Sequence, residues 1–167
     1  ISTIIKDKRE SKETALSLAI KKNNLEIINL LLSNPNIDIN MIIPVISEDS
    51  INKETALSLA IKNKNKQIVD LLLLHPNIDV NMIFREKILG IEYIESALLL
   101  AIRMKNFEVV SSLLSHKNIN VNIIGTEMEI RNKKKTEMNA LIYAIRYNYI
   151  DIVQLLLSCP GIDLKYE

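Results

Sequence analysis

The chain has 167 residues, a formal net charge of +1, no tryptophan and a single cysteine. The near-neutral charge argues against a protein that binds nucleic acid through a general positive field. A lone cysteine excludes an internal disulfide framework and fits a reducing, intracellular location, which we take to be the cytoplasm. No apolar run approaches the roughly 20 residues of a membrane-spanning helix. Because the chain starts at Ile1 with neither Met nor a secretory signal pattern, we expect it to be part of a longer protein.

Four related segments follow one another along the chain and begin at Thr14, Thr55, Ser96 and Asn139. Their first seven residues read TALSLAI, TALSLAI, SALLLAI and NALIYAI, at spacings of 41, 41 and 43 residues. A fixed period of this size is typical of stacked helical units that bury their apolar faces only against one another. The sequence therefore predicts a single array whose units span about 14–54, 55–95, 96–138 and 139–167.

Each unit is predicted to contain two helices. The first begins after the Thr, Ser or Asn that opens the unit, since the oxygen of such a side chain can accept a hydrogen bond from an unpaired backbone N–H. In the first unit this helix covers about 15–22. The second helix carries apolar residues on more than one face, as in Leu25–Leu32. That pattern is expected of a helix packed between two neighbours.

The end of the second helix is marked by Pro35, Pro76 and Pro160. The next position holds Asn36, Asn77, Asn118 and Gly161. Asn and Gly tolerate the left-handed conformation that often ends a helix, so we expect a positive φ at all four. Apolar and polar residues then alternate, as in 37–40, which predicts short extended pieces.

These units resemble the ankyrin repeat over about 14–165. The resemblance rests on the TALSLA opening, on Glu26-Ile27-Ile28 with the three leucines that follow Asn29, and on Asp38-Ile39-Asn40. It implies a mostly α fold, an ankyrin-repeat solenoid of stacked helix-turn-helix pairs joined by β-hairpin fingers. The period exceeds the family's 33 residues by about eight. The additional residues fall in 41–54, 82–95 and 123–138, so the fingers should be long, with 1–13 as the tail of a preceding finger.

The first helix departs from the family motif Thr-Pro-Leu-His-x-Ala in every unit. Ala replaces the Pro, and the His position holds Ser17, Ser58, Leu99 and Ile142. We therefore expect the hydrogen bonding at this helix start to be weakest in the third and fourth units.

The sequence offers little for catalysis. It has no glycine-rich phosphate loop, and His75, His116 and Cys159 occupy one repeat column just after the second helix. Adjacent units should place them about 8–10 Å apart, too far for a catalytic pair or a shared zinc ion. A further column, Glu13, Glu54 and Glu95, is interpreted as favouring the N-termini of the first helices. We predict that the protein is not an enzyme and uses no cofactor or metal.

The resemblance also implies a concave groove, formed by first helices and fingers, where partners commonly dock. At the end of the first helix the chain places one cation per unit, followed by a residue that varies between units. The candidate partner-binding residues are therefore Lys21, Lys22, Lys62, Asn63, Arg103, Met104, Arg146 and Tyr147. A row of cations could follow an acidic segment, but a basic residue also stabilises a helix C-terminus, and both readings stay open.

Two expectations follow from this column. Arg146 and Tyr147 form the best anchor, because Arg and Tyr are common at interface hot spots. The cations are expected to be exposed, so reversing the charge of Lys62 and Arg103 should change the free energy of unfolding by no more than about 0.5 kcal/mol.

The fingers form a second candidate surface. Residues 41–46 are apolar throughout and the second finger is rich in isoleucine, so neighbouring fingers should either pack into a sheet-like wall or expose an apolar patch. The tip of the third finger, 131–135, is basic and should be solvated.

Three functional hypotheses remain. The first is a non-enzymatic scaffold or adaptor that binds another protein in the groove. The alternatives are a binder of an anionic polymer or acidic lipid surface, and the ankyrin region of a larger enzyme or receptor. The last unit keeps apolar residues at Ile152, Val153 and 155–157. We therefore expect the array to continue, or this face to be covered by another molecule, for example by end-to-end self-association.

Overall fold

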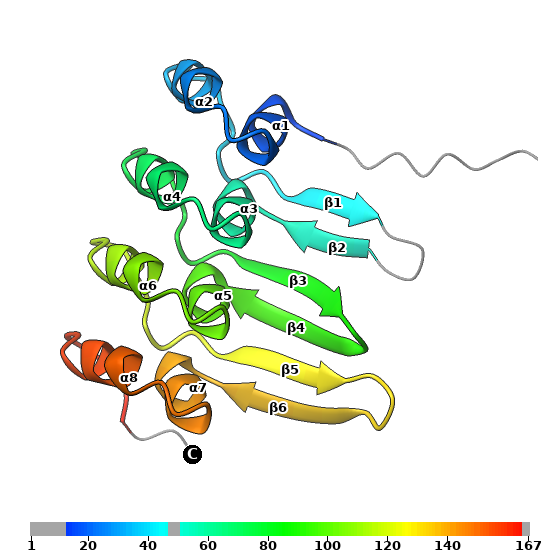
Figure 1. Cartoon of the computed structure of the whole chain (residues 1–167), viewed down its shortest axis with the longest axis vertical. Coiled ribbons are helices and arrows are strands. Elements are labelled where there is room, and N and C mark those ends of the chain that lie inside the picture. The colour runs from blue at the N-terminus through cyan, green and yellow to red at the C-terminus, as the bar shows by residue number, and fades with distance from the viewer. Residues whose placement is uncertain (1–12, 47–50, 165–167) are drawn as a thin grey trace, which may run out of the picture.

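The computed structural model describes residues 13–46 and 51–164 (Figure 1). Within these ranges the first helices of the four units are α1 (Ala15–Lys21), α3 (Ala56–Lys62), α5 (Ala97–Arg103) and α7 (Ala140–Arg146). The second helices are α2 (Leu25–Leu32), α4 (Lys66–Leu73), α6 (Phe107–Leu114) and α8 (Ile150–Leu157). Figure 1 shows two columns of helices, with strands extending from the column of first helices. The predicted stack of helix pairs is confirmed.

The starts of the first helices follow the sequence prediction closely. Thr14 and Thr55 are N-caps in capping boxes, in which the Thr side chain accepts from the backbone of Ser17 or Ser58 and the Ser hydroxyl accepts in return. Ser96 and Asn139 each accept a single such hydrogen bond, because Leu99 and Ile142 have no side-chain oxygen to complete the box. The expected weakening in the third and fourth units is confirmed.

The prediction of a positive φ after the second helix is wrong for Asn36, Asn77 and Asn118, and holds only for Gly161. In the loop after α2, the N–H of Asn36 donates to the side chain of Asn34, and after α4 the N–H of Asn77 donates to His75 Nδ1. These side chains close the turn without a left-handed residue.

Each unit has a left-handed residue between its two helices, at Asn23, Lys64, Lys105 and Asn148, with φ of 52° to 56°. There the chain must reverse within a few residues. No strand forms over 37–40 either: Asp38 accepts from the N–H of Asn40 and makes a turn of this segment.

A column of asparagines ties each unit to the next. The amide nitrogen of Asn40 donates to the carbonyl of Asn77 at 2.7 Å, and its oxygen accepts from the N–H of Asp79 at 2.8 Å. Asn81 and Asn122 make the same pair of bonds to the loops of the third and fourth units. Each side chain satisfies two backbone groups of the neighbouring loop, so this ladder fixes the stacking of the units.

Replacing Asn81 with Ala should therefore lower the free energy of unfolding by about 1–2 kcal/mol, because two hydrogen bonds between units are lost. The matched control is Asn118→Ala, since the side-chain amide of Asn118 makes no hydrogen bond within the described ranges and its backbone carbonyl, which accepts from Asn81, remains. Urea unfolding of both variants measures the difference. Equal losses in the two variants would show that the ladder does not hold the units together.

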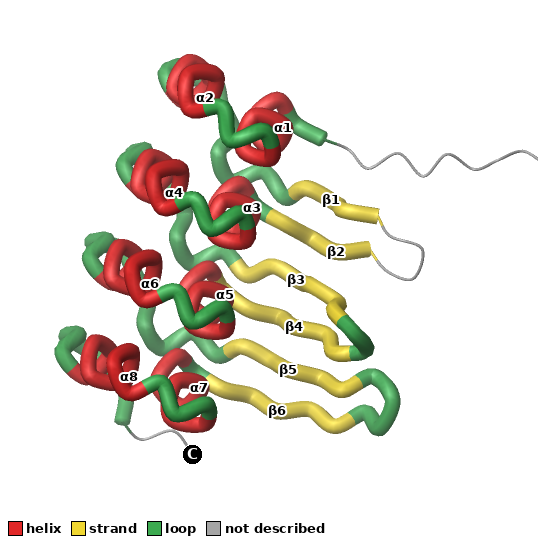
Figure 2. Tube along the Cα trace, in the orientation of Figure 1, coloured by secondary structure: helices red, strands yellow, loops and turns green. Residues whose placement is uncertain are grey.

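The fingers form a continuous antiparallel sheet (Figure 2). Its strands, in order, are β1 (Ile43–Ile46), β2 (Ile51–Glu54), β3 (Ile83–Ile88), β4 (Ile91–Ser96), β5 (Gly125–Glu129) and β6 (Lys134–Met138). Neighbouring hairpins pair with one another, as in Lys53 with Arg85 and Tyr93 with Glu127. Of the two alternatives for the fingers, the packed wall is confirmed.

The outer faces of the array expose aliphatic residues that inner units bury. Leu18 is 45% exposed, whereas Leu59 and Leu100, at the same position in the next units, are buried. Ile145 is 55% exposed, whereas Ile102 is completely buried. In the last unit Ile152 and Leu156 are buried and Leu157 is exposed. The tail expected at 1–13 lies outside the described residues, apart from Glu13.

Candidate functional site

The C-terminal ends of the first helices face the sheet at the inner corner of the molecule. The contacts that define this corner surface run from Lys62 and Arg103 to Glu86 on β3, and from Tyr147 to Glu127 on β5. Cross-strand pairing places Glu86, Tyr93 and Glu127 in one row, so these side chains lie on the same side of the sheet. The corner surface is formed by first helices and fingers, the elements from which the resemblance implies a groove.

Most cations of the predicted binding column are paired. In each of the first three units, a Glu eight residues before the cation forms an ion pair with it: Glu13 with Lys21 at 2.7 Å, Glu54 with Lys62 at 2.7 Å and Glu95 with Arg103 at 2.6 Å. The interpretation of this Glu column as a helix-dipole device is therefore incomplete. Its carboxylates bind the cations at the far end of the same helix.

The pairs of the two inner units merge into one buried cluster. Glu86 bridges Lys62 and Arg103, whose side chains are only 19% and 16% exposed. The expectation that these cations are exposed is wrong, and with it the expectation that their charge can be reversed at little cost. Five ionised groups share this cluster, three carboxylates and two cations, so it holds one negative charge more than positive.

The electrostatics of the cluster reflect its burial. Desolvation raises the pKa of Glu95 even though Arg103 donates hydrogen bonds to it. Burial alone would lower the pKa of Arg103, but the hydrogen bonds and charges of Glu95 and Glu86 outweigh it and raise that pKa. The guanidinium also lies over the ring of Tyr93, 4.2 Å from its centre. Arg103 thus contacts two carboxylates and one aromatic ring, and we interpret it mainly as a structural residue.

The fourth unit breaks the pattern. Met138 stands where the other units have Glu, and it is buried against the array. Arg146 is exposed, and its Nη1 lies 3.7 Å from the sulfur of Met138. Within the described ranges Arg146 forms no ion pair. A guanidinium has five N–H donors, so this cation keeps donors for a ligand.

Tyrosines gather beside Arg146. The Tyr147 ring lies 4.6 Å from that of the buried Tyr143 and 6.1 Å from that of Tyr149, measured between centroids. The Tyr147 hydroxyl donates to Glu127 at 3.3 Å. Desolvation, with the charge of Glu127, raises the pKa of Tyr147, and burial raises that of Tyr143 strongly. The Tyr147 side chain is therefore neutral and is held in place by the neighbouring tyrosine rings and by Glu127. It remains exposed on the corner surface.

The remaining predicted binding residues cap the first helices. Lys22 is exposed, and Asn63 donates to the carbonyl of Ile20 at 3.0 Å, which joins two units. Met104 is half-buried against the core. The structure therefore places all eight candidates at the C-terminal ends of the first helices but gives Lys21, Lys62, Asn63, Arg103 and Met104 internal contacts.

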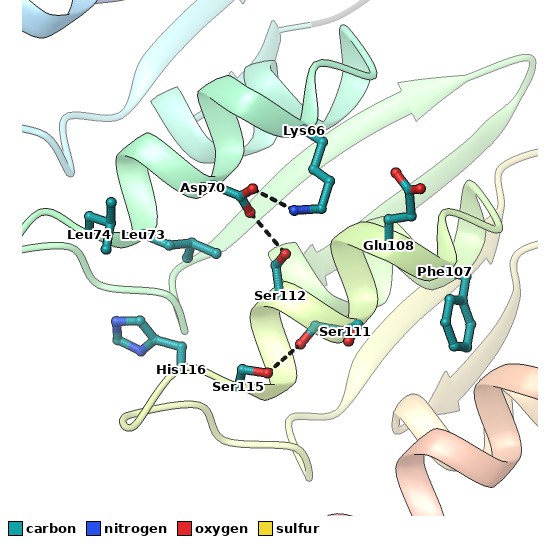
Figure 3. A pocket seen from close by; sticks show the side chains of 10 residues that line it. All are labelled: Lys66, Asp70, Leu73, Leu74, Phe107, Glu108, Ser111, Ser112, Ser115 and His116. Atoms are coloured by element: carbon teal, nitrogen blue, oxygen red, sulfur yellow. Dashed lines mark hydrogen bonds and ion pairs between the residues drawn. The ribbon is translucent and has the colours of Figure 1, made fainter.

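A depression with a volume of about 610 Å³ lies between the second helices α4 and α6, away from the corner surface (Figure 3). Its polar groups bond one another: Asp70 accepts from Lys66 and from Ser112, and Ser115 donates to the carbonyl of Ser111. Exposed Leu74 and Phe107 line its edges. The sequence analysis missed this depression, which arises only from the spacing of two helices. This depression is the main rival surface for a partner.

Comparison with known families decides the fold family. A family model described as "Ankyrin repeats (3 copies)" matches residues 2–84, 41–125 and 87–167. The chain belongs to the ankyrin-repeat family. Ankyrin repeats are, in general, protein–protein interaction modules without enzymatic activity. A search of curated proteins found no match.

Solved ankyrin structures share the fold at low identity. The ankyrin repeat protein EF0377 matches with a TM-score of 0.62 and 20% identity over 95% of this chain. The ankyrin repeat domain of Bcl-3, described as a unique member of the IkappaB protein family, matches with a TM-score of 0.65 and 19% identity over 94% of this chain. This chain spans 67% and 60% of those two chains.

The His and Cys residues of the ankyrin array have structural contacts. His75 and His116 each accept a backbone N–H through Nδ1. The Cys159 thiol donates to the carbonyl of Leu155, and burial raises its pKa. In the described ranges no group of three or more His, Cys, Asp or Glu side chains is arranged to hold a metal ion. None of the described helices has the length and hydropathy needed to span a membrane.

Proposed function

We propose that this ankyrin array is a scaffold or adaptor that binds another protein at the corner surface formed by first helices and fingers. The observation that carries the proposal is the fourth unit, where Arg146 lacks the Glu of the other units and stands beside the exposed ring of Tyr147. Arg and Tyr are the residue types most enriched at interface hot spots. The single cysteine supports a cytoplasmic setting for this role.

The paired charges of the inner units support this role indirectly. Lys62, Arg103 and Glu86 are fixed by one another before any partner arrives, so little side-chain entropy is lost on binding. The same pairing weakens the alternative of an anionic polymer following the whole cation column, because three of its four cations already have carboxylate partners.

End-to-end association is a second candidate. The exposed Leu18 and Ile27 on the first unit occupy positions that the inner units bury, and so does Ile145 on the last. The first unit exposes one half of the interface that neighbouring inner units make with each other, and the last unit exposes the other half. Copies stacked head to tail would therefore cover both. Sedimentation should then show association that Ile145→Lys abolishes; a monomer at all concentrations would contradict it.

The groove proposal is tested by giving Arg146 the partner that the other units have. In the variant Met138→Glu, the new carboxylate should pair with Arg146 as Glu95 pairs with Arg103, and the fold should tolerate it because Glu54 and Glu95 are buried at this position. We expect binding of a partner purified with the wild-type array to weaken about tenfold. Surface plasmon resonance measures the affinity, and thermal unfolding checks the fold.

Two further variants locate the surface. Tyr147→Ala should mainly speed dissociation, because the ring contributes contact area rather than long-range attraction. Phe107→Ala, at the edge of the depression between α4 and α6, is the control and should leave the affinity unchanged. If Phe107→Ala weakens binding while Met138→Glu and Tyr147→Ala do not, the partner binds the depression between α4 and α6 and the proposal is wrong.

A further inference from the structure

The tip of the second hairpin holds an unusual residue. Leu89 and Gly90 form the two-residue turn between β3 and β4, with φ of 48° and 81°. A turn with two positive φ angles favours Asn-Gly or Asp-Gly, and a leucine there adopts the left-handed conformation at a cost. Leu89 is also 98% exposed, so no packing compensates for it. A strained and fully exposed apolar side chain points to a role outside folding.

The neighbouring tip extends the apolar surface. The backbone N–H of Ile130, which follows β5, donates to the carbonyl of Gly90 at 2.9 Å and so joins the second and third hairpins at their ends. Ile130 and Ile88 are exposed beside this bond. The two tips thus present one apolar patch, formed by Ile88, Leu89 and Ile130, at the ends of the hairpins that point away from the helices (Figure 1).

Basic side chains adjoin this patch. Arg131, Lys133, Lys134 and Lys135 are all exposed in the turn and strand that follow Ile130. Residues 129–137 contain these four cations and only two carboxylates. Glu129 accepts a hydrogen bond from Asn132, and Glu137 forms an ion pair with Lys135. The tip therefore carries a local positive charge that the near-neutral chain as a whole does not.

An exposed apolar side chain beside a cationic cluster is complementary to an anionic lipid surface. Membrane association usually needs two such signals, because an apolar insertion or a few cations alone bind only weakly and reversibly. We propose that the tips of the second and third hairpins dock on membranes rich in phosphatidylserine, with Leu89 inserted at the interface and Arg131, Lys133 and Lys134 against the headgroups. The docking residues are distinct from Arg146 and Tyr147 of the corner surface, so this docking does not require the groove function.

The test uses the whole chain and two kinds of vesicle, pure phosphatidylcholine and phosphatidylcholine with 30% phosphatidylserine, about the anionic content that creates a negative surface potential. We expect cosedimentation with the anionic vesicles only, and loss of it at high salt. Leu89→Asn should weaken this binding about tenfold, because one apolar side chain is lost. The same variant should raise the melting temperature by about 2 °C, because Asn suits the turn.

A charge-matched pair of variants completes the test. Lys133→Gln with Lys134→Gln should weaken vesicle binding at least tenfold, whereas Lys64→Gln with Lys117→Gln, which removes two exposed charges on the helical side, should not. A wild-type chain that ignores anionic vesicles overturns the proposal. So does equal binding by wild type and Leu89→Asn, or equal loss in the two lysine variants.

Discussion

Replacing Arg103 with Gln should lower the free energy of unfolding by about 3–5 kcal/mol, which is the cost of leaving buried charges without their partner. The guanidinium donates to Glu95 and Glu86, and its removal leaves three carboxylates facing Lys62 alone. Chemical unfolding of the purified chain measures the loss.

The control for this prediction comes from the same repeat column. Lys21→Gln removes the corresponding cation of the first unit, where the pair with Glu13 is more than a third exposed on both sides. Exposed pairs contribute little, so the loss should stay below about 0.5 kcal/mol. Similar effects of the two substitutions would mean that burial of the inner cluster does not control its contribution.

The acid dependence of the Arg103→Gln variant identifies the electrostatic cause. Burial already raises the pKa of Glu95 in the wild type, and loss of the guanidinium should raise it further. Between the pKa of the unfolded chain, near 4.3, and this raised value, the folded state binds more protons than the unfolded state. The free energy of unfolding should therefore rise as the pH falls from 7 towards 5, and more steeply than in the wild type.

A second large effect is expected at Gly125, the first residue of β5. A Cβ built there would lie 2.5 Å from Leu99 Cδ1 and 3.0 Å from the carbonyl oxygen of Ile94. Because Leu99 is buried, it cannot move into solvent. Gly125→Ala should lower the free energy of unfolding by about 1–3 kcal/mol through overpacking.

The second unit shows how this site can be rebuilt. At the positions of Leu99 and Gly125 it holds Ser58 and Phe84, so the small and the large residue exchange places. The double variant Leu99→Ser with Gly125→Phe should be more stable than the sum of the two single effects by about 2 kcal/mol. Serine can also complete a capping box with Ser96. Strictly additive effects would show that the two positions do not share space.

The sequence predicted the helices and their starts because these depend on residues three or four positions apart. The N-caps at Thr14 and Thr55 could be read directly, and so could the loss of the capping box at Leu99. The error at Asn77 has a local cause as well. Asn is compatible both with a left-handed φ and with a turn closed by a neighbouring side chain, and His75 supplies the second option.

The sequence analysis named the residues of the candidate surface but did not predict their ion pairs. Glu95 and Arg103 lie on either side of a helix of two turns, and nothing in their spacing shows that the strand before the helix returns the carboxylate to its far end. Glu86 lies on β3 of the same hairpin as Glu95, but Lys62 and Glu54 belong to the preceding helix and finger, and they join the cluster only because neighbouring fingers pair into a sheet. The exception at Arg146 could have been read from the sequence, since Met138 interrupts the Glu column.

The most direct test of the proposed groove is photo-crosslinking of the partner complex from three positions. A benzophenone amino acid is placed at Tyr147 on the corner surface, at Phe107 by the depression between α4 and α6, or at Leu89 on the hairpin tip. We predict that the partner is captured efficiently from position 147 and little from 107 or 89. Capture from position 107, with none from 147, would contradict the assignment of the corner surface as the binding site.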